Sequence, residues 1–163
     1  MSQRLKLEIK AMNAIAGEDL VVLVSDKLIP APAAEEWLGE GGRSLIARAA
    51  AAERFKGKAL SGLTILAPEG AGYERLILVG VGPEGERDKL DFALLGGAIA
   101  GRLGHGRSAD IIAALPGGDV SAAEIAEIGL GLRLRCYAFN QYKTKSRDAE
   151  QSEAKTAILR VAD

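Results

Sequence analysis

Two kinds of apolar spacing recur along the chain and predict its secondary structure. Apolar runs and period-two alternation predict strands, whereas apolar residues three and four positions apart predict helices. On this basis we predict strands at 5–9, 20–24, 63–66, 75–81, 109–115 and 156–161. We predict helices at 44–55, 88–103 and 121–139, with one helical turn at 33–38.

The order of these elements predicts an α/β fold. Leu5, Leu7 and Ile9 alternate with charged residues, which is typical of a half-buried strand near a sheet edge. The run 20–24 is apolar throughout, as in a strand buried on both faces, and 75–81 has the pattern of a central strand. Strands and helices alternating in this order form a mixed, mostly parallel sheet with helices on both faces. We therefore predict one three-layer α/β/α domain.

The predicted helices carry recognisable end signals. Ser121 followed three residues later by Glu124 forms a capping box, which favours a helix start. Gly57 follows the helix predicted at 44–55 and is available as its left-handed cap. Glycines inside the helix predicted at 88–103, such as Gly97 and Gly101, weaken a helix, so they predict close approach to a neighbouring element.

Composition narrows the class of protein. The chain has 163 residues, 48% of them apolar but only 4% aromatic, which suits an α/β core built from aliphatic side chains. Its 21 basic and 22 acidic residues provide no overall field that would attract nucleic acid or an anionic membrane. The amino-terminal residues resemble neither a signal nor a transit peptide, and no apolar run approaches the roughly 20 residues that span a bilayer. We expect a cytoplasmic protein without a membrane or nucleic-acid partner.

The segment 80–85 has the spacing of a dinucleotide-binding turn. Its glycines are Gly80, Gly82 and Gly85, between a predicted strand and a predicted helix. Acidic residues follow where a pyrophosphate would be repelled, and no acidic strand end comes about twenty residues later. These acids are Glu84, Glu86 and Asp88. A plain strand-ending turn is favoured over a cofactor site, and phosphate binding is kept as the alternative.

No catalytic or metal-binding set is apparent in the sequence. His105 is the only histidine, and Cys136 the only cysteine, so neither has the partners that a metal ligand or nucleophile requires. Cys136 shares a helical stripe with Leu132 and is interpreted as a buried apolar residue. Asp148 and Glu150 lie in a charged run, where solvation is the default interpretation.

One local charge asymmetry stands out near the end of the chain. Basic residues interleaved with Tyr137 and Tyr142 form a possible charged contact surface for a phosphate or an acidic partner. A solvated helix end is the favoured interpretation, because cations also suit the helix dipole there. The five basic residues are Arg133, Arg135, Lys143, Lys145 and Arg147.

Three segments together resemble the amino-terminal domain of the leucyl (cytosol) aminopeptidase family. The first is the Phe-Lys-Gly-Lys sequence at 55–58, and the second is the strand with its glycine turn at 72–82. The third and most specific is 131–145, in which an aromatic pair is followed by Tyr-Lys-Thr-Lys. Their order and spacing match the family across nearly the whole chain.

The resemblance implies a non-catalytic domain similar to macro domains, covering 1–145, followed by a charged segment and the start of a linker at 146–163. It implies a parent metallo-aminopeptidase whose two divalent metal ions, zinc or manganese, lie in a separate carboxy-terminal domain, and which assembles as a hexamer. The Asp148-Ala149-Glu150 sequence is flanked by Arg147 and Gln151, unlike the metal-binding run of the family. The resemblance therefore assigns no catalytic residue, metal ligand or cofactor to this chain.

Two other hypotheses stay open. The chain could be a free-standing macro-like module that binds ADP-ribose or a related nucleotide through the loops 80–85 and 116–119. It could also bind nucleic acid through the five basic residues, although its balanced charge gives this little support.

Overall fold

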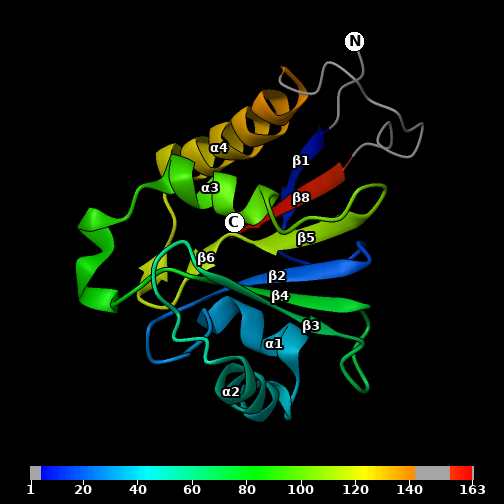
Figure 1. Cartoon of the computed structure of the whole chain (residues 1–163), viewed down its shortest axis with the longest axis vertical. Helices are drawn as coiled ribbons and strands as arrows, with labels where there is room; N and C mark the ends of the chain where they lie inside the picture. Colours follow the sequence, from blue (N-terminus) through cyan, green and yellow to red (C-terminus); the bar gives the residue numbers. More distant parts are fainter. Residues whose placement is uncertain (1–4, 142–154, 163) are drawn as a thin grey trace.

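The computed structural model describes residues 5–141 and 155–162, with the side chains of 5–136 and 155–162. Figure 1 shows a sheet between two helical layers, which confirms the predicted three-layer α/β/α fold. The six-stranded sheet has the order β1-β8-β5-β2-β4-β3 and is parallel except for the antiparallel pair β3 and β4. Its strands are β1 Leu5–Ala11, β2 Asp19–Val24, β3 Gly62–Leu66, β4 Arg75–Gly80, β5 Ser108–Ile112 and β8 Lys155–Val161.

The helices form one pair on each face of the sheet (Figure 1). One layer holds α1 Glu35–Leu38, which follows the 3₁₀ turn η1 Pro32–Ala34, together with α2 Gly42–Glu53. The other layer holds α3 Phe92–Ala100 and α4 Ala122–Gln141. The predicted order of strands and helices is therefore correct.

The sheet separates two hydrophobic cores, and β2 contributes to both. Val21 and Leu23 face the core under α3 and α4, whereas Leu20, Val22 and Val24 face the core under α1 and α2. All five side chains are fully buried. Because successive side chains of a strand point to opposite faces, a strand between two cores must be apolar at every position. The prediction for this run is confirmed, and β1 lies at the sheet edge as its alternation predicts.

The helix predicted at 88–103 is shorter than its apolar spacing suggests. Residues Glu84–Lys89 form a separate 3₁₀ helix, η2, and Leu90 is extended. The α-helix begins only after Asp91, whose carboxylate accepts a hydrogen bond from the Leu94 amide at 3.0 Å. A capping aspartate satisfies a free amide of the first turn, so it fixes the helix start at that position.

The left-handed cap predicted at Gly57 belongs to another residue. Helix α2 ends at Glu53, and Arg54 adopts the left-handed conformation with φ of 56°. Gly57 also has a positive φ, but a Cβ there would lie 2.1 Å from the Ser25 carbonyl oxygen. Gly57 is therefore required for close approach to the end of β2.

The strand predicted at 109–115 is divided in two. Strand β5 ends at Ile112, and Ala114–Leu115 forms β6, which pairs with β7 at Gly118–Asp119 in a separate hairpin. The Ala113 amide still donates to the Arg160 carbonyl of β8 at 2.9 Å, and the chain then leaves the sheet. Apolar periodicity does not reveal this exit, because both pieces are buried.

Strand β8 lies between β1 and β5, held by a buried ion pair. Arg160 Nε donates to Asp110 Oδ1 of β5 at 2.7 Å, and Arg160 Nη1 donates to the Ala11 carbonyl at 3.1 Å. The Asp110 carboxylate also accepts from the Ala16 amide at 3.0 Å. Residues 155–161 are thus part of the sheet, while the domain boundary predicted after residue 145 lies outside the described residues and stays a prediction.

Candidate functional site

The carboxyl ends of β2, β4 and β5 share one edge of the sheet, where ligands bind in open α/β folds. The two loops proposed from the sequence for nucleotide binding, 80–85 and 116–119, meet at this edge. Glu84, Leu115 and Pro116 are among the residues that line the space between the two loops, which is only about 20 Å³. Small-molecule sites measure roughly 300–1,000 Å³, so the contact between these loops is packed rather than hollow.

Three backbone amides of the glycine turn are already engaged within the protein. Gly80 donates to the Ser61 carbonyl at 2.8 Å, Val81 to the Val24 carbonyl at 2.9 Å and Gly82 to the Gly57 carbonyl at 3.1 Å. A phosphate cradle requires amides that point at the ligand. These hydrogen bonds favour the interpretation of the turn as a structural connection.

The glycines of this turn have different roles. A Cβ at Gly80 would lie 2.2 Å from the Lys58 carbonyl oxygen, so only glycine fits there. Gly82 has φ of +76°, a conformation that favours glycine. A Cβ at Gly85 would meet no atom within 4 Å, so this glycine has neither a packing nor a conformational requirement.

A larger cavity of about 500 Å³ lies beside the turn, between it and the segment 56–59. Lys56 and Lys58 line it together with Lys89, whose ammonium pairs with Glu86 at 3.2 Å. Asp26 also lines the cavity, so its charges are mixed. The sequence alone does not predict Lys56 and Lys58 as site residues, because their approach to the turn depends on the Gly57 contact with Ser25.

The single histidine and cysteine lie in unremarkable surroundings. His105 is exposed in the turn between α3 and β5. Cys136 is half-buried on α4, and burial raises the pKa of its thiol despite the nearby charges of Lys155 and Arg135. A raised pKa disfavours the reactive thiolate. Within residues 5–141 and 155–162, no group of three His, Cys, Asp or Glu side chains is placed to hold a metal ion.

The predicted basic surface is described only in part. Arg133 and Arg135 are exposed on α4, whereas Lys143, Lys145 and Arg147 lie outside the described residues, as do Asp148 and Glu150. Residues two apart on a helix point in different directions. Arg135 extends across the end of α3, where its guanidinium lies 3.5 Å from the position of a Cβ on Gly101. The described part therefore does not form one continuous basic face.

An ion-pair cluster at the opposite edge of the sheet was not predicted. Arg107 donates to both oxygens of the fully buried Asp19 carboxylate at 3.0 and 2.6 Å, and to Glu74 at 2.8 Å. The hydrogen bonds from Arg107 to Asp19 and then to Glu74 raise the pKa of Arg107. The cluster joins the starts of β2 and β5 to the residue before β4, which is a structural role.

Comparison with known proteins identifies the family of the chain. A family model described as "Cytosol aminopeptidase family, N-terminal domain" matches residues 21–146. This chain belongs to the cytosol aminopeptidase family. The match is to the amino-terminal domain of the family, which confirms the resemblance of the three segments noted in the sequence.

Curated relatives agree with this assignment. A probable cytosol aminopeptidase of Methylorubrum extorquens is 50% identical over 147 residues, which cover 90% of this chain and 29% of that protein. A probable cytosol aminopeptidase of Xanthobacter autotrophicus is 37% identical and covers all of this chain and 33% of its own length. The chain thus spans about 30% of the length of the curated relatives it matches.

A solved structure supports the fold. A mutant of tomato leucine aminopeptidase superposes on 95% of this chain, and on 32% of its own, with a TM-score of 0.64 and 20% identity. At this identity the likeness concerns the fold alone. In the part of the chain that the structure describes, no helix combines the length and hydropathy needed to cross a membrane.

Proposed function

We propose that this chain is the non-catalytic amino-terminal domain of a cytosolic metallo-aminopeptidase, and that it serves assembly and access to the active site. The match of residues 21–146 to the amino-terminal domain of the family carries this proposal. The chain also spans only about 30% of its relatives, so a parent of similar length has most of its residues elsewhere.

The parent would release amino-terminal residues such as leucine from peptides in the cytoplasm, as a hexamer. Two divalent metal ions, zinc or manganese, would supply the Lewis-acid chemistry for this hydrolysis in the parent. The described residues of this chain do not fit such a site, because they contain no group of three suitable side chains. We assign the metals to the carboxy-terminal domain of the parent, with the division between residues 145 and 146.

Hydrolysis of leucine-4-nitroanilide by the isolated chain and by the full-length parent tests this function. Both proteins are assayed with added zinc or manganese. The parent is expected to release nitroaniline, and the chain is expected to release none at any metal concentration. Turnover by the isolated chain that survives repurification would contradict the proposal, as would a pure, folded parent without peptidase activity.

A second candidate function is nucleotide binding at the cavity beside the glycine turn. Its volume of about 500 Å³ lies within the usual range for small-molecule sites, and Lys56 and Lys58 are exposed at its rim. Calorimetry with ADP-ribose tests this alternative. A micromolar affinity lost in Lys56→Ala and Lys58→Ala, but kept in the exposed Lys27→Ala control, would replace the leading proposal.

A further inference from the structure

The outer surface of the α3–α4 layer is unusually apolar for a solvent-facing helix pair. Leu94 of α3 is 57% exposed, and Leu130 and Leu134 of α4 are 51% and 55% exposed. Leu60, from the loop before β3, is 38% exposed beside them. Clustered exposed leucines mark an interaction surface more often than single ones do.

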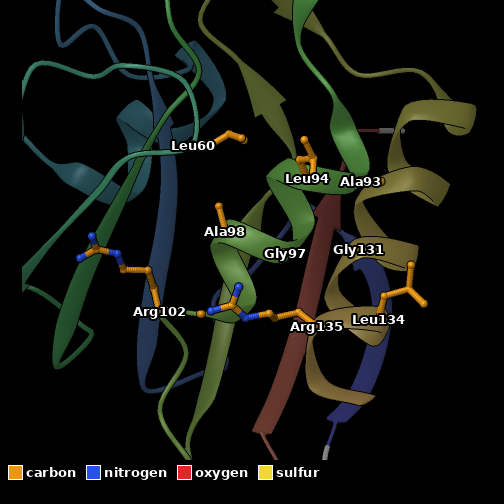
Figure 2. Close-up of a pocket in the computed structure, with 10 residues that line it drawn as sticks. Leu60, Ala93, Leu94, Gly97, Ala98, Arg102, Gly131, Leu134 and Arg135 are labelled. Carbon is orange, nitrogen blue, oxygen red and sulfur yellow. The ribbon is translucent and has the colours of Figure 1, made fainter. Parts of the chain in front are cut away.

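Three of these side chains, Leu60, Leu94 and Leu134, border a groove along α3 (Figure 2). Small residues of α3 and α4 form its floor, among them Gly97, Ala98 and Gly131. Leu60 and Arg102 lie on one side of α3, whereas Leu134 and Arg135 come from α4 on the other side (Figure 2). The groove has a volume of about 650 Å³, enough for several side chains of a docked segment.

The two walls of the groove are held in a fixed relation. A Cβ at Gly131 of α4 would lie 1.8 Å from the Ala93 carbonyl oxygen of α3. A Cβ at Gly96 of α3 would lie 2.1 Å from the Ile128 carbonyl oxygen of α4. The helix backbones are thus in direct contact, and a partner finds a preformed surface that loses little entropy on binding.

The charged residues of the groove indicate which kind of partner it can bind. Arg102 and Arg135 are its only charged lining residues, and neither forms an ion pair within the described part of the chain. A second copy docked about a two-fold axis would bring the same patch against itself, with arginines near arginines and no carboxylate between them. The groove instead fits a different surface, one that combines apolar side chains with acidic ones.

We propose that the α3–α4 groove is the docking surface for the remaining polypeptide of the same parent chain. Apolar side chains of that region pack against Leu60, Leu94 and Leu134, and its carboxylates pair with Arg102 and Arg135. This inference rests on the proposed function, since the relatives are about three times longer than this chain. To the proposed function it adds which face of the domain is covered and what kind of side chains the covering segment carries.

Thiol labelling tests the proposal in the full-length parent. Cys136→Ala first removes the only cysteine of this chain, and Leu94→Cys or Leu134→Cys then places a thiol in the groove. Ala47→Cys, at an exposed position of α2 on the opposite layer, is the matched control. Any cysteines of the remaining polypeptide are followed separately by mass spectrometry of the labelled peptides.

The proposal predicts that Leu94→Cys and Leu134→Cys react at least tenfold more slowly in the parent than in the isolated chain. Ala47→Cys is expected to react equally fast in both. Equal rates at the groove positions in both proteins would overturn the proposal. Protection that disappears when the parent is diluted to monomers would also overturn it, because a neighbouring subunit would then be the occupant.

A charge-reversal variant distinguishes a loss of docking at the groove from a general structural change in the parent. In the parent, Arg135→Glu is expected to raise the labelling rate of Leu94→Cys several-fold, because it opposes the acidic side chains of the occupant. Arg133→Glu, on the same helix but outside the groove, is expected to leave the rate unchanged. Identical effects of the two reversals would contradict the assigned charges. The labelling readout does not require peptidase activity, so an inactive parent refutes the proposed function without deciding this inference.

Discussion

The two helical layers cover the two faces of the same sheet, and their outer surfaces differ in polarity. Helix α2 buries Ile46 and Ala50 and exposes charged residues such as Arg48 and Glu53. Helix α3 buries Leu95 and Ile99 to the same extent, yet exposes Leu94. A helix with a single apolar stripe buries that stripe against one neighbouring element. A helix with apolar residues on other sides as well is typically covered on those sides too. The comparison indicates which layer faces a partner.

The layers also differ in how closely their helices approach. Gly96 and Gly131 bring α3 and α4 into backbone contact. The close approach predicted for the helix at 88–103 is therefore present, but not at Gly97 and Gly101, where a Cβ would find room. The α1–α2 layer relies instead on larger side chains such as Leu38, Leu45 and Ile46. The following substitutions test these differences, beginning with the largest expected effect.

Replacing Asp110 with alanine should cause the largest loss in the free energy of unfolding. Its neighbour Ile112 faces the α1–α2 core, so Asp110 points to that side of the sheet, where it pairs with the buried Arg160. Removing one partner of a buried ion pair costs about 3–5 kcal/mol. Urea unfolding measures this loss, with Glu86→Ala as the control, because the exposed pair of Glu86 with Lys89 is expected to contribute at most about 1 kcal/mol. Similar losses in both variants would show that burial of the pair is not important.

Gly131→Ala should destabilise the chain by about 1–3 kcal/mol or more, because the added Cβ forces α3 and α4 apart. Gly97→Ala is the matched control in the facing helix. A Cβ at Gly97 would approach only the Gly131 carbonyl oxygen, at 4.0 Å, so this variant is expected to gain about 0.5–1 kcal/mol from helix propensity. Thermal unfolding of both variants shows whether each substitution raises or lowers the stability of the chain. Stabilisation by both would indicate that the helices do not need their close approach.

Ser121→Ala should cost about 1 kcal/mol by removing the cap of α4. Its hydroxyl accepts from the Glu124 amide at 3.2 Å, and the Glu124 carboxylate accepts from the Ser121 amide at 2.9 Å. Helix α2 has no side-chain cap, so Ser44→Ala in its first turn is expected to change the free energy of unfolding by less than about 0.5 kcal/mol. Denaturant titration of the two variants gives the comparison, and equal losses would reject the assigned cap.

Replacing the exposed leucines should have the smallest effect on stability. Leu94→Ser and Leu134→Ser are expected to change the free energy of unfolding of the isolated chain by less than about 0.5 kcal/mol and to raise its solubility. The adjacent and fully buried Leu95 is the contrast, since Leu95→Ala is expected to cost about 2–5 kcal/mol. A large loss in Leu94→Ser would mean that Leu94 stabilises this domain itself rather than a partner contact.

The local pattern of the sequence determined most elements of the fold, apart from the division of 88–103 and of 109–115. The continuous run at 20–24 identified the strand shared by two cores, and Ser121 with Glu124 identified the start of α4. The three family segments were also readable without a structure, and the family match confirms them. These features depend on residues within a few positions of one another, where periodicity and capping act.

Only the tertiary structure decided where distant segments meet. Strand β8 enters between β1 and β5 through the pairing of Arg160 with Asp110, 50 positions away, and Arg107 reaches Asp19 across 88 positions. The groove likewise combines Leu60 with residues of α3 and α4. An exposed leucine and a buried one have the same letter in the sequence, as Leu94 and Leu95 show. Leu95 is buried in the core between the sheet and its helices, because the packing of the whole chain determines which side of a helix is covered.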